Sequence, residues 1–332
     1  MNRRAFLTTA ACTLATASAG AQNTVAPAYR FSAAIDYSAA RDGAALLIAR
    51  NGVVLAERYA DGADPGTLWP LGAATRAFAA LLAASLVQDG VMRLDEPVGM
   101  TLGDWAADPA KSVISIQALL AGVSGLSFNG QEPSLAAALA LTPSTPPGAR
   151  FSDDAAAYLL FSEIARRKLI TTGNGLDPAS YLMERTLGPV GCTPVAWART
   201  QDGVLLHDGA AASARGWAQM GELIRREGVW RAEQLVDGFT VREAMRGGFV
   251  EPRAGIGLWL AAGSTDPSPL AGSDLWRMRP PAPLDLVMAA GDAGQRLYII
   301  PSQRLVIVRL PRNAAARGWS DAEFLPLLYR DL

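Results

Sequence analysis

Short apolar runs near the two ends of the chain have the pattern of β-strands. In AALLIARNGVVLAERYA, two such runs flank Asn51-Gly52, a dipeptide typical of a two-residue hairpin turn. We therefore expect strands near residues 44–50 and 53–60. GIGLWLAAG at 255–263 has the apolar run of another strand, and QRLYIIPSQRLVIVRL predicts a second hairpin that turns at 301–304.

From residue 71 to residue 247 the apolar positions recur mostly at helical spacing. RAFAALLAASLVQDG places Phe78, Leu81, Leu82 and Leu86 on one face of an expected helix that ends at Gly90. SIQALLAG, DAAAYLLFSEIARRK and ARGWAQMGELIRREG predict three further helices. Near the C-terminus, Ser320 and Glu323 have capping-box spacing at the start of a final helix.

This order predicts an α/β protein whose antiparallel sheet is assembled from both ends of the chain. Residues 33–70 and 248–332 are expected to form an α/β lobe in which helices flank the sheet. Residues 71–247 are expected to form a mostly helical lobe, and residues 22–32 a linker.

The first 21 residues have the composition of an export signal. Arg3 and Arg4 precede a short run of small and apolar residues, and Ala19-Gly20-Ala21 provides an A-x-A cleavage site. The order Arg-Arg-x-Phe-Leu resembles a twin-arginine signal, although an ordinary secretory signal with two arginines has the same features. We therefore expect a periplasmic or secreted protein. No later apolar run approaches membrane-spanning length, so we expect no membrane span.

Composition narrows the classes of partner. Half of the 332 residues are hydrophobic, which suffices for one large core or for two domains that share one. A net charge of -1 gives no basic surface for nucleic acid. The chain lacks the H-E-x-x-H, C-x-x-C, G-x-S-x-G and Gly-Lys phosphate-loop motifs, so no metal and no cofactor are expected. The single histidine, His207, is expected to be a loop residue without a catalytic role. The sequence assigns no oligomeric state.

Six segments in the same order resemble the β-lactamase-related serine hydrolases. This group contains class C β-lactamases, DD-peptidases, EstB-type esterases and 6-aminohexanoate oligomer hydrolases. The resemblance runs from about residue 40 to 312, and its segments are LIARNGVVLAERYADGA, LVQDGVMRLDEPVG, ISIQALLAGVSGL, PPGARFSDDAAAYLLFSEI, ASARGWAQMGELIRREGVW and GDAGQRLYIIPSQRLVIVRL. It implies a serine β-lactamase/DD-peptidase-like fold.

The resemblance also implies a particular chemistry. In this family a serine and a lysine at i and i+3 share one helix face, so that the amine takes the proton of the nucleophilic hydroxyl. A tyrosine of a Y-x-N motif relays protons. A lysine, a histidine or a small polar residue on a late strand completes the site, and two backbone N–H groups form an oxyanion hole.

At the matching positions of this chain the reacting side chains are missing. The nucleophile position is Ala73, and the lysine position is Arg76, whose guanidinium remains protonated at neutral pH. The tyrosine and asparagine positions fall on Asp153 and Ala155. The late strand has Asp292-Ala293-Gly294 in place of a Lys- or His-Thr-Gly-like motif.

We therefore expect a family member without acyl-transfer activity. Arg76 and Asp153 are expected to form a buried or half-buried ion pair, with Asp292 also facing the guanidinium. The remaining pocket is expected to take a small molecule, a peptide, a peptidoglycan fragment or a partner protein. Two alternatives stay open: an esterase or amidase that uses Ser124 or Ser152, and a structural envelope protein whose pocket is filled.

Overall fold

The computed structural model describes residues 30–130, 133–193, 195–201, 203–261, 272–313 and 318–332. The predicted export signal at 1–21 and most of the predicted linker lie outside these residues. Phe31–Leu332 form one compact unit. Within the part that is described, no helix has both the length and the apolar composition needed to cross a bilayer.

A six-stranded sheet joins the two ends of the chain, as predicted. Its strand order is β10-β11-β12-β13-β1-β2, and every neighbouring pair is antiparallel. The strands are β1 (Gly43–Arg50), β2 (Val53–Tyr59), β10 (Trp259–Leu260), β11 (Val287–Ala290), β12 (Arg296–Ile300) and β13 (Leu305–Pro311). β10 is much shorter than the strand expected over 255–263, of which 262–263 lie outside the described residues.

The predicted turn between the first two strands is present. Asn51 and Gly52 both have positive φ, at 53° and 77°. These values match the right-handed twist of the flanking strands, and they explain why this dipeptide is found here. β1 is buried along almost its whole length, because alternate side chains enter two different cores.

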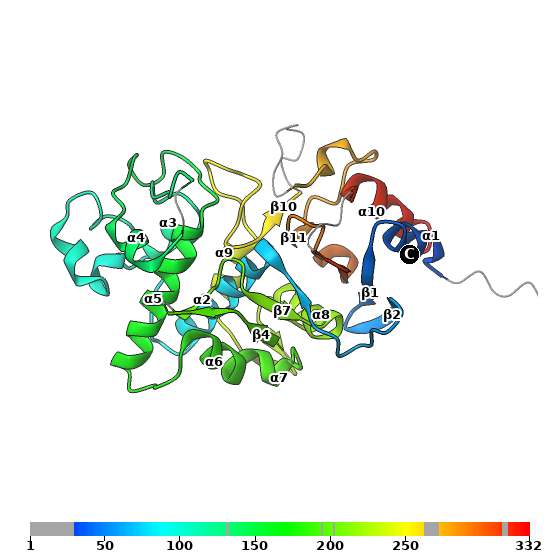
Figure 1. The fold of residues 1–332 in the computed structure, drawn as a ribbon, viewed down its shortest axis with the longest axis horizontal. Helices are drawn as coiled ribbons and strands as arrows, with labels where there is room; N and C mark the ends of the chain where they lie inside the picture. Colours follow the sequence, from blue (N-terminus) through cyan, green and yellow to red (C-terminus); the bar gives the residue numbers. More distant parts are fainter. Residues whose placement is uncertain (1–29, 131–132, 194, 202, 262–271, 314–317) are drawn as a thin grey trace, which may run out of the picture. The chain divides into compact units, whose positions relative to one another are not determined.

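Helices cover both faces of the sheet. On one face, Leu47 and Val308 share a core with Trp217 of α8 (Ala214–Arg225). On the other face, Ile48 shares a second core with Phe324 of α10 (Asp321–Tyr329), and α10 lies beside α1 (Ser32–Ala39) (Figure 1). Ser320 caps α10 as predicted, by accepting a hydrogen bond from the Glu323 N–H at 3.1 Å.

The chain between β2 and β10 is mainly helical, again as predicted. Besides α8, its helices are η1 (Gly72–Arg76), α2 (Ala77–Gln88), η2 (Val98–Met100), η3 (Gly103–Ala107), α3 (Ile116–Leu120), α4 (Leu135–Ala140), α5 (Ala155–Thr171), α6 (Pro178–Leu182), the π-helix η4 (Met183–Leu187), α7 (Gly188–Val190) and α9 (Gly238–Ala244). Two short 3-10 turns follow later, η5 (Leu275–Arg277) and η6 (Pro301–Gln303).

Three small sheets complete the described structure. β3 (Trp69–Pro70), β7 (Ala210–Ala212) and β4 (Val195–Trp197) form the first, β5 (Arg199–Thr200) and β6 (Gly203–Val204) the second, and β8 (Val229–Trp230) and β9 (Glu233–Gln234) the third. The lobe boundaries at 70/71 and 247/248 remain a prediction.

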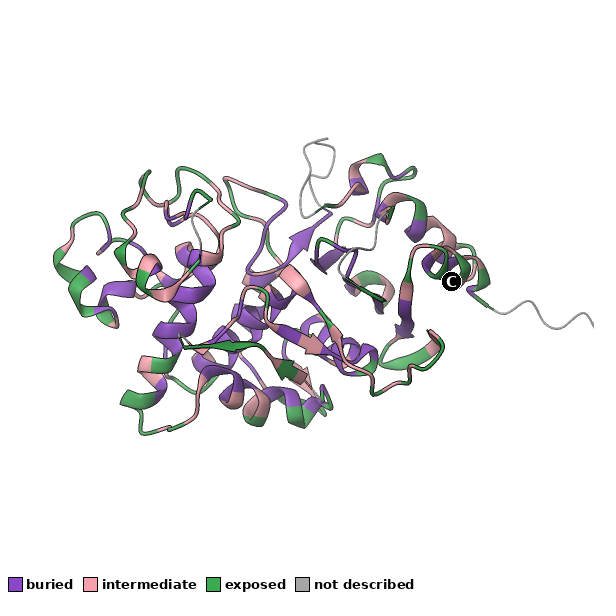
Figure 2. Ribbon diagram, viewed as in Figure 1, coloured by how far each residue is buried: buried purple, intermediate pink, exposed green. Residues whose placement is uncertain are grey.

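The helix expected to carry Phe78, Leu81, Leu82 and Leu86 on one face is α2, which ends at Gln88. Every residue from Ala77 to Leu86 is buried, so this helix runs through the core and has no solvent face. Its neighbour α5 is also largely buried, as its purple colour in Figure 2 shows. The small alanine side chains of α2 let the surrounding helices and strands approach closely.

Candidate functional site

The segment Gly72–Arg76 is held at the start of α2 by the small sheet beside it. The Leu71 N–H donates to the Ala210 carbonyl at 2.9 Å, and the Ala210 N–H donates to Thr75 Oγ1 at 3.1 Å. Thr75 is fully buried, so its hydroxyl is part of the fold and does not face the site. Gly72 has φ of 55°, a conformation that glycine adopts without strain.

Ala73 lies in the first turn of this 3-10 helix and is partly exposed. Backbone N–H groups in the first turn of a helix lack partners inside the helix, and they carry partial positive charge. This position can therefore attract an anion or a carbonyl oxygen through its backbone. Its methyl group has no atom that can attack one.

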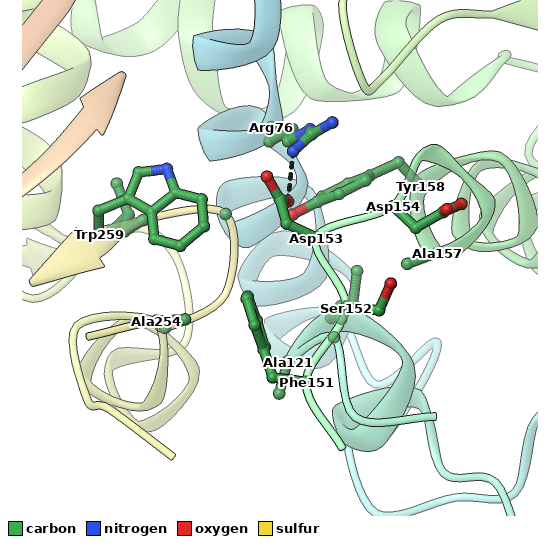
Figure 3. A pocket seen from close by; sticks show the side chains of 15 residues that line it. Arg76, Ala121, Phe151, Ser152, Asp153, Asp154, Ala157, Tyr158, Ala254 and Trp259 are labelled. Carbon is green, nitrogen blue, oxygen red and sulfur yellow. Dashed lines mark ion pairs between the residues drawn. The ribbon is translucent and has the colours of Figure 1, made fainter. Parts of the chain in front are cut away.

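Arg76 and Asp153 form the predicted ion pair, through Nη1 and Oδ1 (Figure 3). The Arg76 side chain is 15% exposed and that of Asp153 is 34% exposed, so the pair is half-buried. The Arg76 guanidinium also lies over the ring of Tyr158, 5.3 Å from its centroid. Among the described residues, Arg76 Nε is buried and has no hydrogen-bond partner.

The charges around the pair determine its protonation. Burial lowers the pKa of Arg76, but Tyr158, Asp153 and Asp292 together outweigh burial and raise it, so the guanidinium remains a cation. For Asp153, burial raises the pKa, and the attraction of Arg76 opposes that rise. A guanidinium with a raised pKa is not a base at neutral pH, so Arg76 does not replace a lysine chemically.

A narrow cavity opens beside the pair. Its volume is about 20 Å³, which is room for about one water molecule. Phe151 and Trp259 form an aromatic wall, with ring centroids 6.1 Å apart and planes at 81°. Residues that line the cavity include Arg76, Phe151, Ser152, Asp153, Tyr158 and Trp259 (Figure 3).

A glycine makes the approach of this wall to the helix feasible. Gly257 has φ of 64°, and a Cβ at this position would lie 2.2 Å from the Arg76 carbonyl oxygen. A larger residue at 257 would therefore push the segment that carries Trp259 away from Arg76.

The turn after β11 carries Asp292 and Gly294, the predicted late-strand positions. Asp292 is exposed and forms no ion pair within the described part of the chain, although its negative charge contributes to the raised pKa of Arg76. That Asp292 faces the guanidinium stays a prediction. The Ala293 N–H donates to Gln295 Oε1 at 3.1 Å, and Gln295 Nε2 donates to the Pro70 carbonyl at 3.4 Å. The Ala293 N–H is therefore already paired with the Gln295 side chain.

Sequence reasoning missed the loop that carries His207 and Asp208. Asp208 Oδ1 lies 3.7 Å from the position of a Cβ on Gly72. Burial lowers the pKa of the half-buried His207, whose charged neighbours include Asp208, Arg76 and Asp154. No motif marks this loop. Only the pairing of β7 with β3 brings it to the site.

The serines and the second aspartate considered from sequence have structural surroundings. Ser124 is buried, and its Oγ accepts a hydrogen bond from the Leu126 N–H at 3.3 Å. Asp154 caps α5, since it accepts from the Ala156 N–H at 2.9 Å and from Ser127 Oγ at 2.8 Å. Ser152 lines the cavity, but its hydroxyl has no hydrogen bond to a base among the described residues.

Aromatic residues near the site divide into two groups. Trp105 belongs to the core, with its indole N–H bonded to the Leu139 carbonyl at 3.2 Å, and Trp69 packs against the same core. Tyr158 and Trp259 line the cavity. The described residues contain no cluster of three histidine, cysteine, aspartate or glutamate side chains placed to hold a metal ion.

A family model described as Beta-lactamase matches residues 30–314. No curated protein matches the chain.

Solved structures of the same fold cover most of this chain. A penicillin-binding protein homologue from Caulobacter crescentus superposes with a TM-score of 0.69 at 17% identity, over 91% of this chain and 98% of that one. A beta-lactamase/D-alanine carboxypeptidase from Pseudomonas syringae has a TM-score of 0.66 at 15% identity, with the same two coverages. A beta-lactamase from Mycobacterium bovis has a TM-score of 0.63 at 19% identity, over 90% and 96%.

Proposed function

The chain belongs to the beta-lactamase family, and on that premise we propose that it is a member without acyl-transfer activity that binds a small ligand at the former reaction site. The proposal rests on the two residues at the family's reaction positions. Ala73 has no nucleophilic atom, and Arg76 is a cation that forms an ion pair with Asp153. A serine hydrolase needs a hydroxyl and a base in this place.

The competing hydrolase reading uses Ser124 or Ser152. Ser124 is buried in a turn, and Ser152 has no base within hydrogen-bond distance in the described structure. The structural-protein reading is favoured by one observation, the cavity volume of about 20 Å³, which is too small for an acyl substrate. A peptide or a peptidoglycan fragment would have to lie mainly outside this cavity.

Hydrolysis assays on matched variants test the proposal. The full chain is incubated with a chromogenic cephalosporin and with a p-nitrophenyl ester, beside Ala73→Ser and the double variant Ala73→Ser/Arg76→Lys. We expect no turnover by the wild type above that of an Arg76→Met control. The competing hypothesis predicts that the wild type turns over substrate, that Ala73→Ser keeps this activity and that Ser152→Ala loses it. This combination would establish a hydrolase that uses Ser152.

The double variant also probes the surroundings of residue 73. Labelling of Ala73→Ser/Arg76→Lys by a fluorophosphonate, with none in the wild type, is expected if the backbone donors still accept a tetrahedral oxyanion. If neither protein is labelled, the reagent cannot reach residue 73. This result would favour the hypothesis of a structural envelope protein with a filled pocket.

We also propose export through the twin-arginine route, on the strength of Arg3-Arg4 and the A-x-A site at 19–21. Cell fractionation of the wild type and of Arg3→Lys/Arg4→Lys tests this. Retention of only the variant in the cytoplasm is the expected result. Equal export of both proteins would favour an ordinary secretory signal, and cytoplasmic wild type would contradict export.

A further inference from the structure

The candidate site contains more carboxylates than its single guanidinium neutralises. Asp153 and Asp154 line the cavity, Asp208 lies beside Gly72, and both Asp208 and Asp292 interact electrostatically with Arg76. Arg76 contacts Asp153 alone among them. Asp208 and Asp292 are exposed and have neither a hydrogen bond nor an ion pair to another side chain within the described residues.

A second and independent feature is the hydroxyl of a buried tyrosine, which lines the cavity without a hydrogen-bond partner in the described structure. Tyr158 is 5% exposed, yet its hydroxyl makes no hydrogen bond to any described residue. Figure 3 shows its ring below Arg76 with the hydroxyl directed toward Asp153. A polar group that the protein leaves unpaired in a cavity takes its partner from water or from a ligand.

The size and walls of the cavity restrict what can be this partner. A volume of about 20 Å³ accepts one group of the size of water. Phe151 and Trp259 form the wall, and aromatic faces attract cations. His207 adds no positive charge at neutral pH, because burial lowers its pKa below the usual 6.5.

From these features we infer that the site binds the primary ammonium group of an alkylamine, with the ammonium in the cavity against Asp153 and Tyr158 and the alkyl chain along Phe151 and Trp259. An ammonium has three donors, and both the tyrosine oxygen and the free carboxylate oxygen of Asp153 are acceptors. Asp208 and Asp292 add a negative field around Arg76. A carboxylate ligand is disfavoured, because it would meet this field and would have to displace Asp153 from Arg76.

This inference deepens the proposed function, since it names the ligand class of the same site. The single histidine provides a reporter, because its ring signals are the only imidazole signals of the chain in an NMR spectrum. Hexylammonium is titrated into the full chain, with hexanoate and hexanol in parallel at constant ionic strength. A saturable shift of the His207 signals with hexylammonium alone is the expected result.

Variants assign the response to particular groups. Asp153→Asn removes the negative charge that faces the ammonium, and Tyr158→Phe removes a hydrogen-bond acceptor. Each should weaken binding by about tenfold. Asp208→Asn and Asp292→Asn change exposed carboxylates that have no partner to lose in the fold. Each should weaken binding about two- to fivefold. Asp104→Asn, an exposed aspartate in η3, is the matched control and should bind like the wild type.

The inference is overturned if hexylammonium gives no saturable shift, if hexanoate or hexanol produces the same response, or if Tyr158→Phe and Asp292→Asn both bind like Asp104→Asn. These outcomes are separate from failure of the proposed function. An active hydrolase is revealed by turnover whether or not hexylammonium binds. A protein that neither turns over nor binds hexylammonium loses only the ammonium site.

Discussion

Two of the arginine–aspartate–tyrosine groups in the described structure differ in how completely their polar atoms are used. Under α10, Arg296 pairs with Asp321 through two hydrogen bonds of 2.9 and 3.2 Å. The Tyr298 hydroxyl and the Trp319 indole N–H also donate to Asp321. Arg296 and Asp321 are 2% and 1% exposed.

In the second group, Arg76, Asp153 and Tyr158, one ion pair stands alone. Arg76 Nε and the Tyr158 hydroxyl lack partners among the described residues, and Asp153 is a third exposed. Buried polar networks that hold a fold together are saturated, whereas sites keep capacity for something else. The first group therefore belongs to the fold, and the unused polar atoms of the second group support the proposal that it binds a ligand.

The largest expected effect separates the two aspartates. Asp321→Asn leaves the Arg296 guanidinium buried without its counter-charge, so the free energy of unfolding should fall by about 3–5 kcal/mol. Asp153→Asn breaks a partly exposed pair and should cost no more than about 1 kcal/mol. Urea unfolding of both variants beside the wild type measures the difference. Similar losses in the two variants would end the distinction between the groups.

Substitution of Tyr298 should also destabilise the fold more than substitution of Tyr158, but by a smaller difference than for the two aspartates. Tyr298→Phe removes a hydrogen bond to a buried carboxylate and should lower the free energy of unfolding by about 1–2 kcal/mol. Tyr158→Phe removes a hydroxyl that bonds nothing in the described structure, so its stability should equal that of the wild type or slightly exceed it. Thermal unfolding of the two variants checks this. A clear loss in Tyr158→Phe would reveal a structural partner for that hydroxyl.

A fall in pH should change the contributions of Asp321 and Asp153 to the free energy of unfolding in opposite directions. The network lowers the pKa of Asp321 below 3.8, so its stabilisation is present above the unfolded value and is lost as pH falls below it. Burial raises the pKa of Asp153 above 3.8, so the folded state gains relative stability as pH falls through that raised value.

The resulting pH dependence is measurable as a difference between proteins. As pH falls from 7 toward 3, the stability advantage of the wild type over Asp321→Asn should shrink, while its stability relative to Asp153→Asn should increase. Unfolding free energies of the three proteins across this range test both trends. Parallel curves for the two variants would contradict the assigned directions.

The sequence predicted the sheet and most helices because their signals are local. Asn51-Gly52 specifies its own turn, and the Ser320 cap depends on a residue three positions away. The Arg76–Asp153 pair was predicted from the family resemblance, because two substitutions at adjoining site positions had complementary charge.

Contacts between segments that are distant in the sequence could not be predicted from local patterns. His207 and Asp208 come to the site only through strand pairing, and no residue pattern indicates that pairing. The large apolar residues of α2 mark one buried face, but the burial of its alanines depends on elements that pack from the other sides. The hydrogen bond from the Ala293 N–H to the Gln295 side chain depends on the conformation of one turn, which the sequence does not reveal.

The most direct test of the account is the intact mass of the full chain after incubation with a penicillin and with a fluorophosphonate. This measurement detects a nucleophile that becomes acylated or phosphonylated without turning over, which hydrolysis assays miss. The account predicts an unchanged mass with both reagents, because Ala73 offers no nucleophile and Arg76 no base. A stoichiometric adduct on folded protein would contradict it, and peptide mapping would then identify the reacting hydroxyl.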